Sequence, residues 1–239
     1  MKNFVKTSGK GWICKPTRLW YNKSVALRRL AEKTGTRRRG IPVPGLSRYR
    51  GGRGRGGRKK SDRMEREIEM EVRQEQPQDY DEVYRVVREA FASAEHRDGN
   101  EQDLVAALRK SRAFVPPLSL VAVEDGRVVG HILFTEIRIG DKTDLALAPL
   151  SVLPAYQRQG IGQALMAQGH AEAARLRYGF SVVLGSPAYY SRAGYVPAAR
   201  YGIRSPFDVP DEYFMALDLQ GNSPDREGTV EYAPEFFSV

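Results

Sequence analysis

The sequence predicts a mixed α+β fold, in which one β-sheet carries helices on both of its faces. Short apolar runs separated by turn residues, as between 118 and 134, indicate neighbouring strands. Apolar residues at helical spacing in 83–91 and again in 161–176 indicate two amphipathic helices. In chain order the predicted elements are βααβββαβαβ with one further strand, and this alternation favours helices packed on both sides of the sheet.

The charge of the 239-residue chain is divided between two segments. Residues 1–60 contain nineteen Lys and Arg and one acidic residue, a charge of +18, whereas the rest of the chain carries −9. Residues 1–63 also lack sustained apolar periodicity, so we expect a disordered basic extension there. Residues 64–239 then form the folded domain.

Three interpretations of the basic extension remain open. The favoured one is that translation begins at Met64, because the extension resembles no processing signal cleanly. The second is an Arg-Gly-rich segment that tracks nucleic-acid phosphates, and the third is an Arg-rich organelle transit peptide. Nucleic acid is therefore a predicted partner only if the extension is native. Within it, only Val25–Lys33 is compatible with a short helix.

Composition also narrows the classes of site. Cys14 is the only cysteine, which excludes an intrachain disulfide. The three histidines, His96, His131 and His170, lie far apart in sequence, and no Cys/His spacing indicates a metal site, so we expect none. No apolar run reaches the ~18 residues of a membrane helix, and the N-terminus lacks a secretory signal. We therefore expect a cytoplasmic protein without a membrane partner.

The domain begins with a predicted strand and two helices. The strand has apolar residues at every second position, namely Ile68, Met70 and Val72. Asp79 and Glu82 then resemble a capping box. The helix that follows has one apolar face, formed by Val83, Val86, Val87, Ala90 and Phe91. A shorter helix, 101–110, has Asn100 as its cap.

Three strands are predicted after these helices. Pro116-Pro117 is expected to break the chain, so the first strand, 118–123, begins after the prolines. Asp125-Gly126 is a strong hairpin signal, and the second strand continues from 128 to about 139. The third covers 144–152 and leads into a loop that contains two glycines.

The remaining elements alternate between helix and strand. A helix runs from 162 to about 178, and its inward face consists of Ile161, Leu165, Gly169, Ala173 and Leu176. Ser181–Leu184 is a short strand, and Ala188–Arg192 is a short helix closed by Gly194. Phe214–Leu219 is the last clear strand.

The loop between strand and helix carries the strongest chemical signal. Gly160 and Gly162 let the backbone bend tightly and approach a ligand closely. The free N–H groups of the loop and of the first helical turn add to the helix dipole, and Arg158 adds a positive charge. We therefore predict a site for a diphosphate. A P-loop is excluded because no Lys-Ser/Thr follows, and a dinucleotide fingerprint because its third glycine is absent.

Three short motifs carry a family resemblance. They are Val152-Leu-Pro-x-Tyr156, Gln157-x-x-Gly160-x-Gly162 and Tyr190-x-x-x-Gly194-Tyr195. Together they resemble the GNAT superfamily of N-acetyltransferases, and the stretch from Leu184 to Tyr195 looks especially like its YhbS-like predicted N-acetyltransferases. The resemblance covers about Glu65 to Leu219. It implies the GNAT-like acyl-CoA N-acyltransferase fold, with a mixed, mostly antiparallel sheet.

The resemblance also implies a coenzyme site made largely by backbone. The residues implied to bind acyl-CoA are Leu150, Val152, Gln157, Arg158, Gln159, Gly160, Ile161 and Gly162. The loop would hold the pyrophosphate, and the end of the preceding strand would pair with the pantetheine arm and supply an oxyanion-stabilising N–H. The gap between this strand and Ser181–Leu184 would admit the thioester. Tyr190 would be catalytic and protonate the departing thiolate, whereas Tyr189 is expected to pack.

The general base is not fixed by the sequence. Some relatives carry a glutamate at the position of Ala146. Glu136, Asp144 or a water molecule are the candidates here. His131 is expected to be a hydrogen-bonded structural residue on a strand face, and His170 is expected on the polar side of its helix.

The predicted function is a metal-independent N-acyltransferase. It would move an acetyl or other short acyl group from acyl-CoA to a primary amine, by direct attack in a ternary complex. The amine could be a small molecule, a peptide N-terminus or a lysine, in a pocket lined by the two early helices and by loops 134–144 and 196–213. The acceptor and the oligomeric state are not predicted. The alternative is a non-catalytic acyl-CoA-binding or nucleic-acid-associated protein that uses the Arg/Gly-rich extension.

Overall fold

The computed structural model describes residues 4–6, 12–14, 70–92 and 99–238. β1 (Phe4–Lys6) and β2 (Trp12–Cys14) form an antiparallel pair of their own, which the sequence did not predict. The Arg-Gly-rich run, the short helix expected at Val25–Lys33 and Ile68 of the first predicted strand lie outside the described residues. The disordered extension thus stays a prediction.

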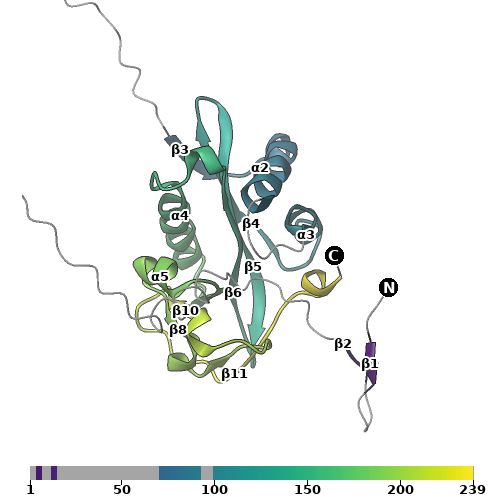
Figure 1. Cartoon of the computed structure of the whole chain (residues 1–239). Helices are drawn as coiled ribbons and strands as arrows, with labels where there is room; N and C mark the ends of the chain where they lie inside the picture. The colour runs from purple at the N-terminus through teal and green to yellow at the C-terminus, as the bar shows by residue number, and fades with distance from the viewer. Residues whose placement is uncertain (1–3, 7–11, 15–69, 93–98, 239) are drawn as a thin grey trace, which may run out of the picture. The chain divides into compact units, whose positions relative to one another are not determined.

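A mostly antiparallel sheet organises residues 70–238 (Figure 1). Its strands lie in the order β3-β4-β5-β6-β7-β10-β8, and β11 and β9 are added beside the end of β5. The central strands are β3 (Met70–Gln74), β4 (Phe114–Glu124), β5 (Arg127–Ile139), β6 (Lys142–Val152), β7 (Phe180–Leu184) and β10 (Phe214–Asp218). The short strands are β8 (Val196–Pro197), β9 (Ile203–Arg204) and β11 (Gly228–Glu231). The pairs β6–β7 and β9–β11 are parallel.

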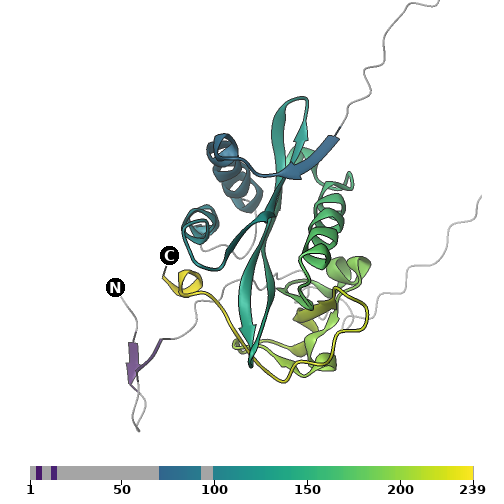
Figure 2. The ribbon, with the colours of Figure 1, turned by 180° about the vertical axis from the view of Figure 1, so that it is seen from behind.

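Helices cover both faces of this sheet, as Figures 1 and 2 show from opposite sides. α2 (Tyr80–Ala92) and α3 (Glu101–Leu108) lie on one face, and α4 (Ile161–Arg175) and α5 (Pro187–Tyr190) lie on the other. The predicted apolar faces are the buried ones, because side chains at helical spacing point toward the sheet. They include Val83, Val86 and Val87 of α2 and Leu165 and Ala173 of α4. The α+β prediction is confirmed.

β4 differs from its predicted bounds. The strand already begins at Phe114, so the expectation that Pro116-Pro117 breaks the chain before 118 was wrong. Phe114 pairs with Thr135 and Ser119 with Leu133, and the register therefore slips across the prolines. Proline has no N–H to donate, and a strand tolerates it where the ladder is interrupted in this way.

The start of α2 also differs from the predicted capping box. A 3₁₀ turn, Pro77–Asp79, precedes the helix, and Asp79 Oδ2 accepts the N–H of Gln76 at 2.7 Å. Arg73 donates to the same carboxylate and so lowers the pKa of Asp79 below its ordinary value. Glu82 instead accepts the N–H of Val128 at 3.1 Å. Glu82 therefore ties α2 to β5 and is not a partner in the cap.

The C-terminal segment returns to the middle of the fold. β11 pairs with β5 at Arg138 and Ile139, and a 3₁₀ turn, Pro234–Phe237, contacts α3. The remaining 3₁₀ turns are Pro154–Tyr156, Ser191–Ala193, Ala198–Tyr201 and Asp211–Tyr213. Only one further strand was predicted in this region. The pairing of the C-terminal segment with β5 was therefore not predicted from the sequence.

Candidate functional site

The loop that joins β6 to α4 presents a run of unpaired backbone donors. Residues 157–160 are exposed, and Gly160 takes a positive φ of 89° immediately before α4 begins at Ile161. The N–H groups of residues 158–163 make no hydrogen bond to any other described residue. Such amides at a helix N-terminus attract an anion, because the helix dipole points the same way. The loop thus has the backbone geometry that an anion site requires, and the binding of an anion there stays a prediction.

Side chains hold this loop in shape. Gln157 Nε2 donates to the carbonyl of Val152 at 3.0 Å, and Gln159 Nε2 donates to the carbonyl of Ala155 at 3.0 Å. Both glutamines therefore brace the loop from within. Arg158 is exposed and has a φ of 63°, a left-handed conformation that side chains rarely adopt. Its guanidinium is free to meet an anion.

The two glycines of the loop serve different purposes. Gly160 supplies the left-handed turn, as predicted. Gly162 lies within α4 and is buried, and a methyl group there would overlap the hydroxyl of Tyr189. The expectation that Gly162 bends the backbone was wrong, because its lack of a side chain makes room for a tyrosine. The side chain of Ile161 is also buried, so this residue can offer a ligand only its backbone.

β6 separates from β7 close to this loop. The two strands pair only at Leu145 with Ser181 and at Ala146 with Val182. Farther along, β6 slips in register against β5 between the Phe134–Leu147 and Ile132–Leu150 pairs. From there to Val152 the strand has a ladder on its β5 side only. Among the described residues no strand pairs with the outer edge of β6 from Leu150 to Val152, although Gln157 occupies the Val152 carbonyl; that the pantetheine arm binds along this edge stays a prediction.

Three tyrosines cluster beside this edge. The rings of Tyr189 and Tyr190 meet edge to face at 5.1 Å, and Tyr190 meets Tyr195 in the same way at 5.7 Å. The ring of Tyr190 lies over Gly185 at the end of β7, so close that a side chain on Gly185 would overlap it. Burial raises the pKa of Tyr190 above its ordinary value. Tyr190 therefore stays protonated at neutral pH, as a proton donor must.

His170 was misplaced by the sequence analysis. It is not on a polar surface, because its ring packs against Phe134 and Tyr195. Its Nε2 lies 3.0 Å from the Tyr195 hydroxyl, which in turn lies 2.8 Å from Ser181 Oγ. Burial lowers the pKa of His170 to about 4, so it is neutral at pH 7. The chain from His170 to Ser181 fixes the Tyr195 ring on which Tyr190 packs.

The two carboxylates considered as general bases have different surroundings. Asp144 is fully buried, and its Oδ1 accepts the N–H groups of Gly179 and Phe180 at 3.1 and 2.8 Å. Its Oδ2 pairs with Arg226 Nε at 2.9 Å. Glu136 is partly exposed and accepts a hydrogen bond from Tyr178 at 2.7 Å. Asp144 is thus a structural anchor, whereas Glu136 retains access to water.

His131 belongs to a buried polar cluster under α2 and α3. Its Nε2 lies 3.1 Å from Ser119 Oγ, and Ser119 Oγ donates to Glu75 Oε2 at 2.6 Å. Glu75 also pairs with Arg109, at the end of α3. Burial lowers the pKa of His131 to about 4. The expectation of a hydrogen-bonded structural histidine is confirmed, and the cluster anchors the end of α3 to the sheet.

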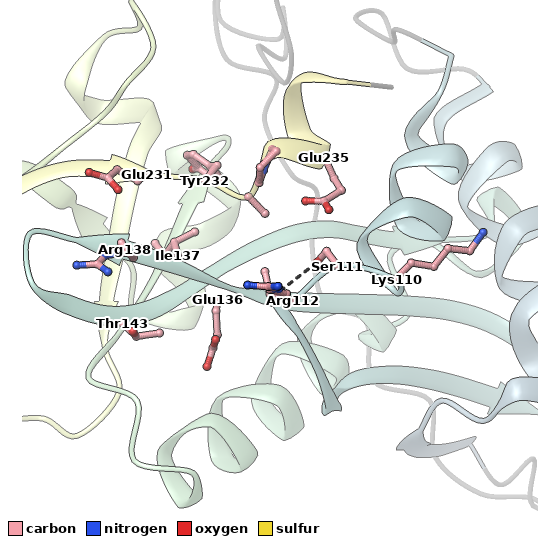
Figure 3. A pocket seen from close by; sticks show the side chains of 13 residues that line it. Lys110, Ser111, Arg112, Glu136, Ile137, Arg138, Thr143, Glu231, Tyr232 and Glu235 are labelled. Atoms are coloured by element: carbon pink, nitrogen blue, oxygen red, sulfur yellow. Dashed lines mark hydrogen bonds between the residues drawn. The ribbon is translucent and has the colours of Figure 1, made fainter.

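A hollow of about 550 Å³ lies at the other end of β5 and β6 (Figure 3). Its walls come from the turn that follows α3 (110–113), from β5 (136–138), from Thr143 and from the C-terminal segment (231–235). In Figure 3, Glu136 points away from Tyr232. One oxygen of Glu235 is buried and has no partner among the described residues. The C-terminal wall was not predicted.

The described residues contain no cluster of three or more His, Cys, Asp or Glu side chains suited to a metal ion. Within the same residues, no helix is both long enough and apolar enough to cross a bilayer.

The chain matches known proteins over the part that carries this site. The model of the Acetyltransferase (GNAT) family matches residues 80–195. The uncharacterized N-acetyltransferase YjhQ of Escherichia coli K12 is 37% identical over 125 residues, which are 50% of this chain and 69% of YjhQ. The uncharacterized N-acetyltransferase YhbS of the same strain is 30% identical over 171 residues, which are 70% of this chain and 98% of YhbS.

Two solved structures are similar over the same region. A GNAT family acetyltransferase from Brucella melitensis, in complex with acetyl-CoA, superimposes with a TM-score of 0.60 and 35% identity. The match covers 71% of this chain and 99% of that one. Escherichia coli YhbS, in complex with CoA, superimposes with a TM-score of 0.64 and 28% identity, over 71% of this chain and 93% of YhbS.

Proposed function

Because this chain belongs to the GNAT acetyltransferase family, we propose that it transfers an acetyl group from acetyl-CoA to a primary amine by direct attack in a ternary complex. The observation that carries the proposal is the run of unpaired N–H groups at residues 158–163, beside the open edge of β6. Two structural relatives were solved with acetyl-CoA or CoA, which supports the same cosubstrate here.

The donor would bind mainly to backbone. Its diphosphate would accept hydrogen bonds from the loop and from the first turn of α4, with Arg158 as an added cation. The pantetheine arm would follow the edge of β6 from Val152 to Leu150. A backbone N–H in this stretch would stabilise the oxyanion of the thioester carbonyl. The parting of β6 from β7 supports an acetyl group at that point.

The chemistry balances without a covalent enzyme intermediate. The amine nitrogen attacks the thioester carbon and forms a C–N bond, and the carbonyl electrons move onto oxygen. Collapse of this adduct breaks the C–S bond. The thiolate takes the Tyr190 proton, and the amine passes a proton to a base, so that the products are an N-acetyl amine and CoA. The Tyr190 phenol, whose ordinary pKa of ~10 is raised by burial, is a weaker acid than a thiol of pKa ~8.5, so it would act mainly by hydrogen-bonding the thiolate as charge develops and would pass on its proton while the thiolate is itself shielded from water.

Water is the best-supported route for the amine proton. Both oxygens of Asp144 are occupied by strong donors, so this carboxylate is poorly suited to act as a base. Glu136 has one oxygen bonded to Tyr178 and is partly exposed, so it can receive the proton through water. Proton transfer over one or more water molecules requires no direct contact between Glu136 and the amine.

The hollow of Figure 3 is proposed as the acceptor pocket. It lies at the far end of β6 from the donor edge: Thr143 in its wall is seven residues from Leu150, about 23 Å along an extended strand, so an acceptor bound there would have to be long enough for its amine to reach the thioester. Glu235 offers a carboxylate oxygen that has no partner among the described residues, and an ammonium group would pair with it. Arg112, which also lines the hollow, would donate hydrogen bonds to an anionic group of the acceptor.

A thiol-release assay tests the function. Acetyl-CoA is offered to the protein with a panel of amines, peptides and polyamines, and free CoA thiol is measured. The matched variant is Gly160→Asp, which puts a negative charge and a strained left-handed side chain at the diphosphate site. Calorimetry should show acetyl-CoA affinity falling by roughly 30-fold or more, from ~2 kcal/mol of lost binding. Unchanged affinity would remove the loop from the donor site, and binding without turnover of any amine would favour the non-catalytic alternative.

A further inference from the structure

The hydroxyl of Tyr189 lies against the first turn of α4. A methyl group on Gly162 would overlap that hydroxyl oxygen and would lie 3.7 Å from Leu150 Cδ2. Gly162 itself has an ordinary helical backbone, so the chain does not need glycine there for conformation. The space is instead filled by a polar atom from a distant helix, α5. Glycine at 162 is therefore explained by the approach of the Tyr189 hydroxyl.

This position lies between the two parts of the proposed donor site. On one side is Gly162, whose N–H belongs to the unpaired run at 158–163. On the other side is Leu150, at the open edge of β6. The Tyr189 hydroxyl makes no hydrogen bond to another described residue, although its side chain is only partly exposed. A hydroxyl held beside free N–H groups adds a further donor to an anion site.

We propose that Tyr189 binds the coenzyme, with its hydroxyl donating a hydrogen bond to a diphosphate oxygen at the start of α4. The inference rests on the proposed function and assigns to Tyr189 a role that differs from that of Tyr190. Burial raises the pKa of Tyr189 above its ordinary value, which keeps the hydroxyl protonated as a donor. The expectation that Tyr189 only packs is replaced by this role.

Tyr189 and Tyr190 would then have different roles in donor binding and catalysis. Their rings stand nearly perpendicular, at 85°, and the two side chains lie against different parts of the fold. Tyr189 reaches α4, whereas Tyr190 lies over Gly185 at the end of β7. One residue would hold the nucleotide half of the donor and the other would serve the sulfur. Loss of either hydroxyl should therefore give a different kinetic signature.

The experiment measures donor binding in Tyr189→Phe by calorimetry and by steady-state kinetics. A hydrogen bond to a charged group predicts roughly tenfold weaker acetyl-CoA binding, seen mainly as a higher donor KM rather than a lower kcat. The KM for S-acetylpantetheine, which lacks the diphosphate, should not change. Tyr190→Phe is the contrasting variant and should lower kcat while leaving the acetyl-CoA Kd unchanged.

A double-mutant cycle with Gly162→Ala tests the geometry. Alanine should displace the hydroxyl and weaken acetyl-CoA binding in the wild-type background, but should have little further effect beside Tyr189→Phe, because the overlapping oxygen is then absent. Thermal midpoints confirm that each variant is folded. Equal acetyl-CoA affinity of Tyr189→Phe and the wild type would overturn the inference. Failure of the wild type to bind acetyl-CoA would instead overturn the proposed function.

Discussion

The two ends of strand β6 differ in the groups that they offer to a ligand: backbone groups at one end and side chains at the other. Near Val152 the strand has no partner on one side, and the loop beyond it exposes the N–H groups of residues 158–163. Near Lys142 the backbone is paired, and side chains supply the polar groups. Asp144 is saturated there by Gly179, Phe180 and Arg226. On the proposed function, the protein would hold its donor by backbone groups and select its acceptor by side chains.

The largest expected effect tests the proposed catalytic group, Tyr190, whose ring lies over Gly185 at the end of β7. Tyr190→Phe should lower kcat by roughly 10²–10⁴-fold, the usual range for a lost general acid. The acetyl-CoA Kd should barely change, because the hydroxyl acts as charge develops on sulfur. Donors whose thiols have lower pKa values should suffer less, because such thiolates leave without help. Presteady-state and steady-state rates with a series of acyl donors provide the measurement.

The pH dependence sharpens the same test. Burial raises the pKa of Tyr190, so the acid form persists above neutral pH and its ionisation should not limit kcat below about pH 10. A kcat that falls near pH 8 in the wild type but not in Tyr190→Phe would mean that Tyr190 ionises there, and would contradict the raised pKa while leaving the acid role in place. A Tyr190→Phe enzyme with near wild-type kcat would leave the residue with a packing role only.

Asp144→Asn should destabilise the end of β6 at which both oxygens of the Asp144 carboxylate accept hydrogen bonds. The amide oxygen can still accept from the β7 backbone, but Arg226 loses its charged partner while its side chain is only 13% exposed. Removal of one member of such a pair costs about 3 kcal/mol of folding free energy. Thermal unfolding should show a midpoint lower by roughly 6–12 °C. The pH profile of kcat/KM should keep its shape, and loss of its acidic limb would restore Asp144 as a base.

Glu235→Gln should have a more moderate effect, confined to the acceptor. If an ammonium group pairs with the unpartnered oxygen, the neutral amide should raise the KM of cationic acceptors about tenfold, the scale of one charge-assisted hydrogen bond. The donor KM should not change, because the C-terminal wall is not part of the loop site. The control is Glu231→Gln, an exposed wall residue. Equal acceptor KM values in Glu235→Gln and the wild type would detach this hollow from the acceptor.

The strand, loop and helix of the proposed donor site could be predicted because their sequence patterns are local. A glycine before a helix, an apolar strand before the loop and the order of the elements are readable from consecutive residues, and the structure shows each of them. Long-range contacts were not readable in the same way. Asp144 meets Arg226 82 residues later, and Gly162 is explained only by Tyr189.

Periodicity also has limits at positions that can face two ways. His170 fits the polar side of an isolated helix, and only the packing of Tyr195 and Phe134 over α4 makes its position partly buried. The prolines at 116 and 117 were expected to interrupt the chain before the strand, but β4 accommodates them through a shift in its register with β5. The acceptor hollow depends on the C-terminal segment, whose return to β5 has no sequence motif. These features follow from tertiary contacts rather than from residue patterns.

The smallest expected effect is that of Arg158→Gly. This variant tests whether backbone N–H groups, rather than the Arg158 side chain, hold the diphosphate. Arg158 has a φ of 63°, which costs a non-glycine residue about 1 kcal/mol, so glycine should leave stability unchanged or slightly raised. The lost guanidinium is exposed, so acetyl-CoA binding should weaken only about two- to fivefold, and the difference should vanish at 0.5 M salt because exposed charges are screened. Arg158→Lys keeps the charge and should bind like the wild type. A large, salt-independent loss in Arg158→Gly would mean that a side chain, and not the N–H groups of residues 158–163, holds the diphosphate.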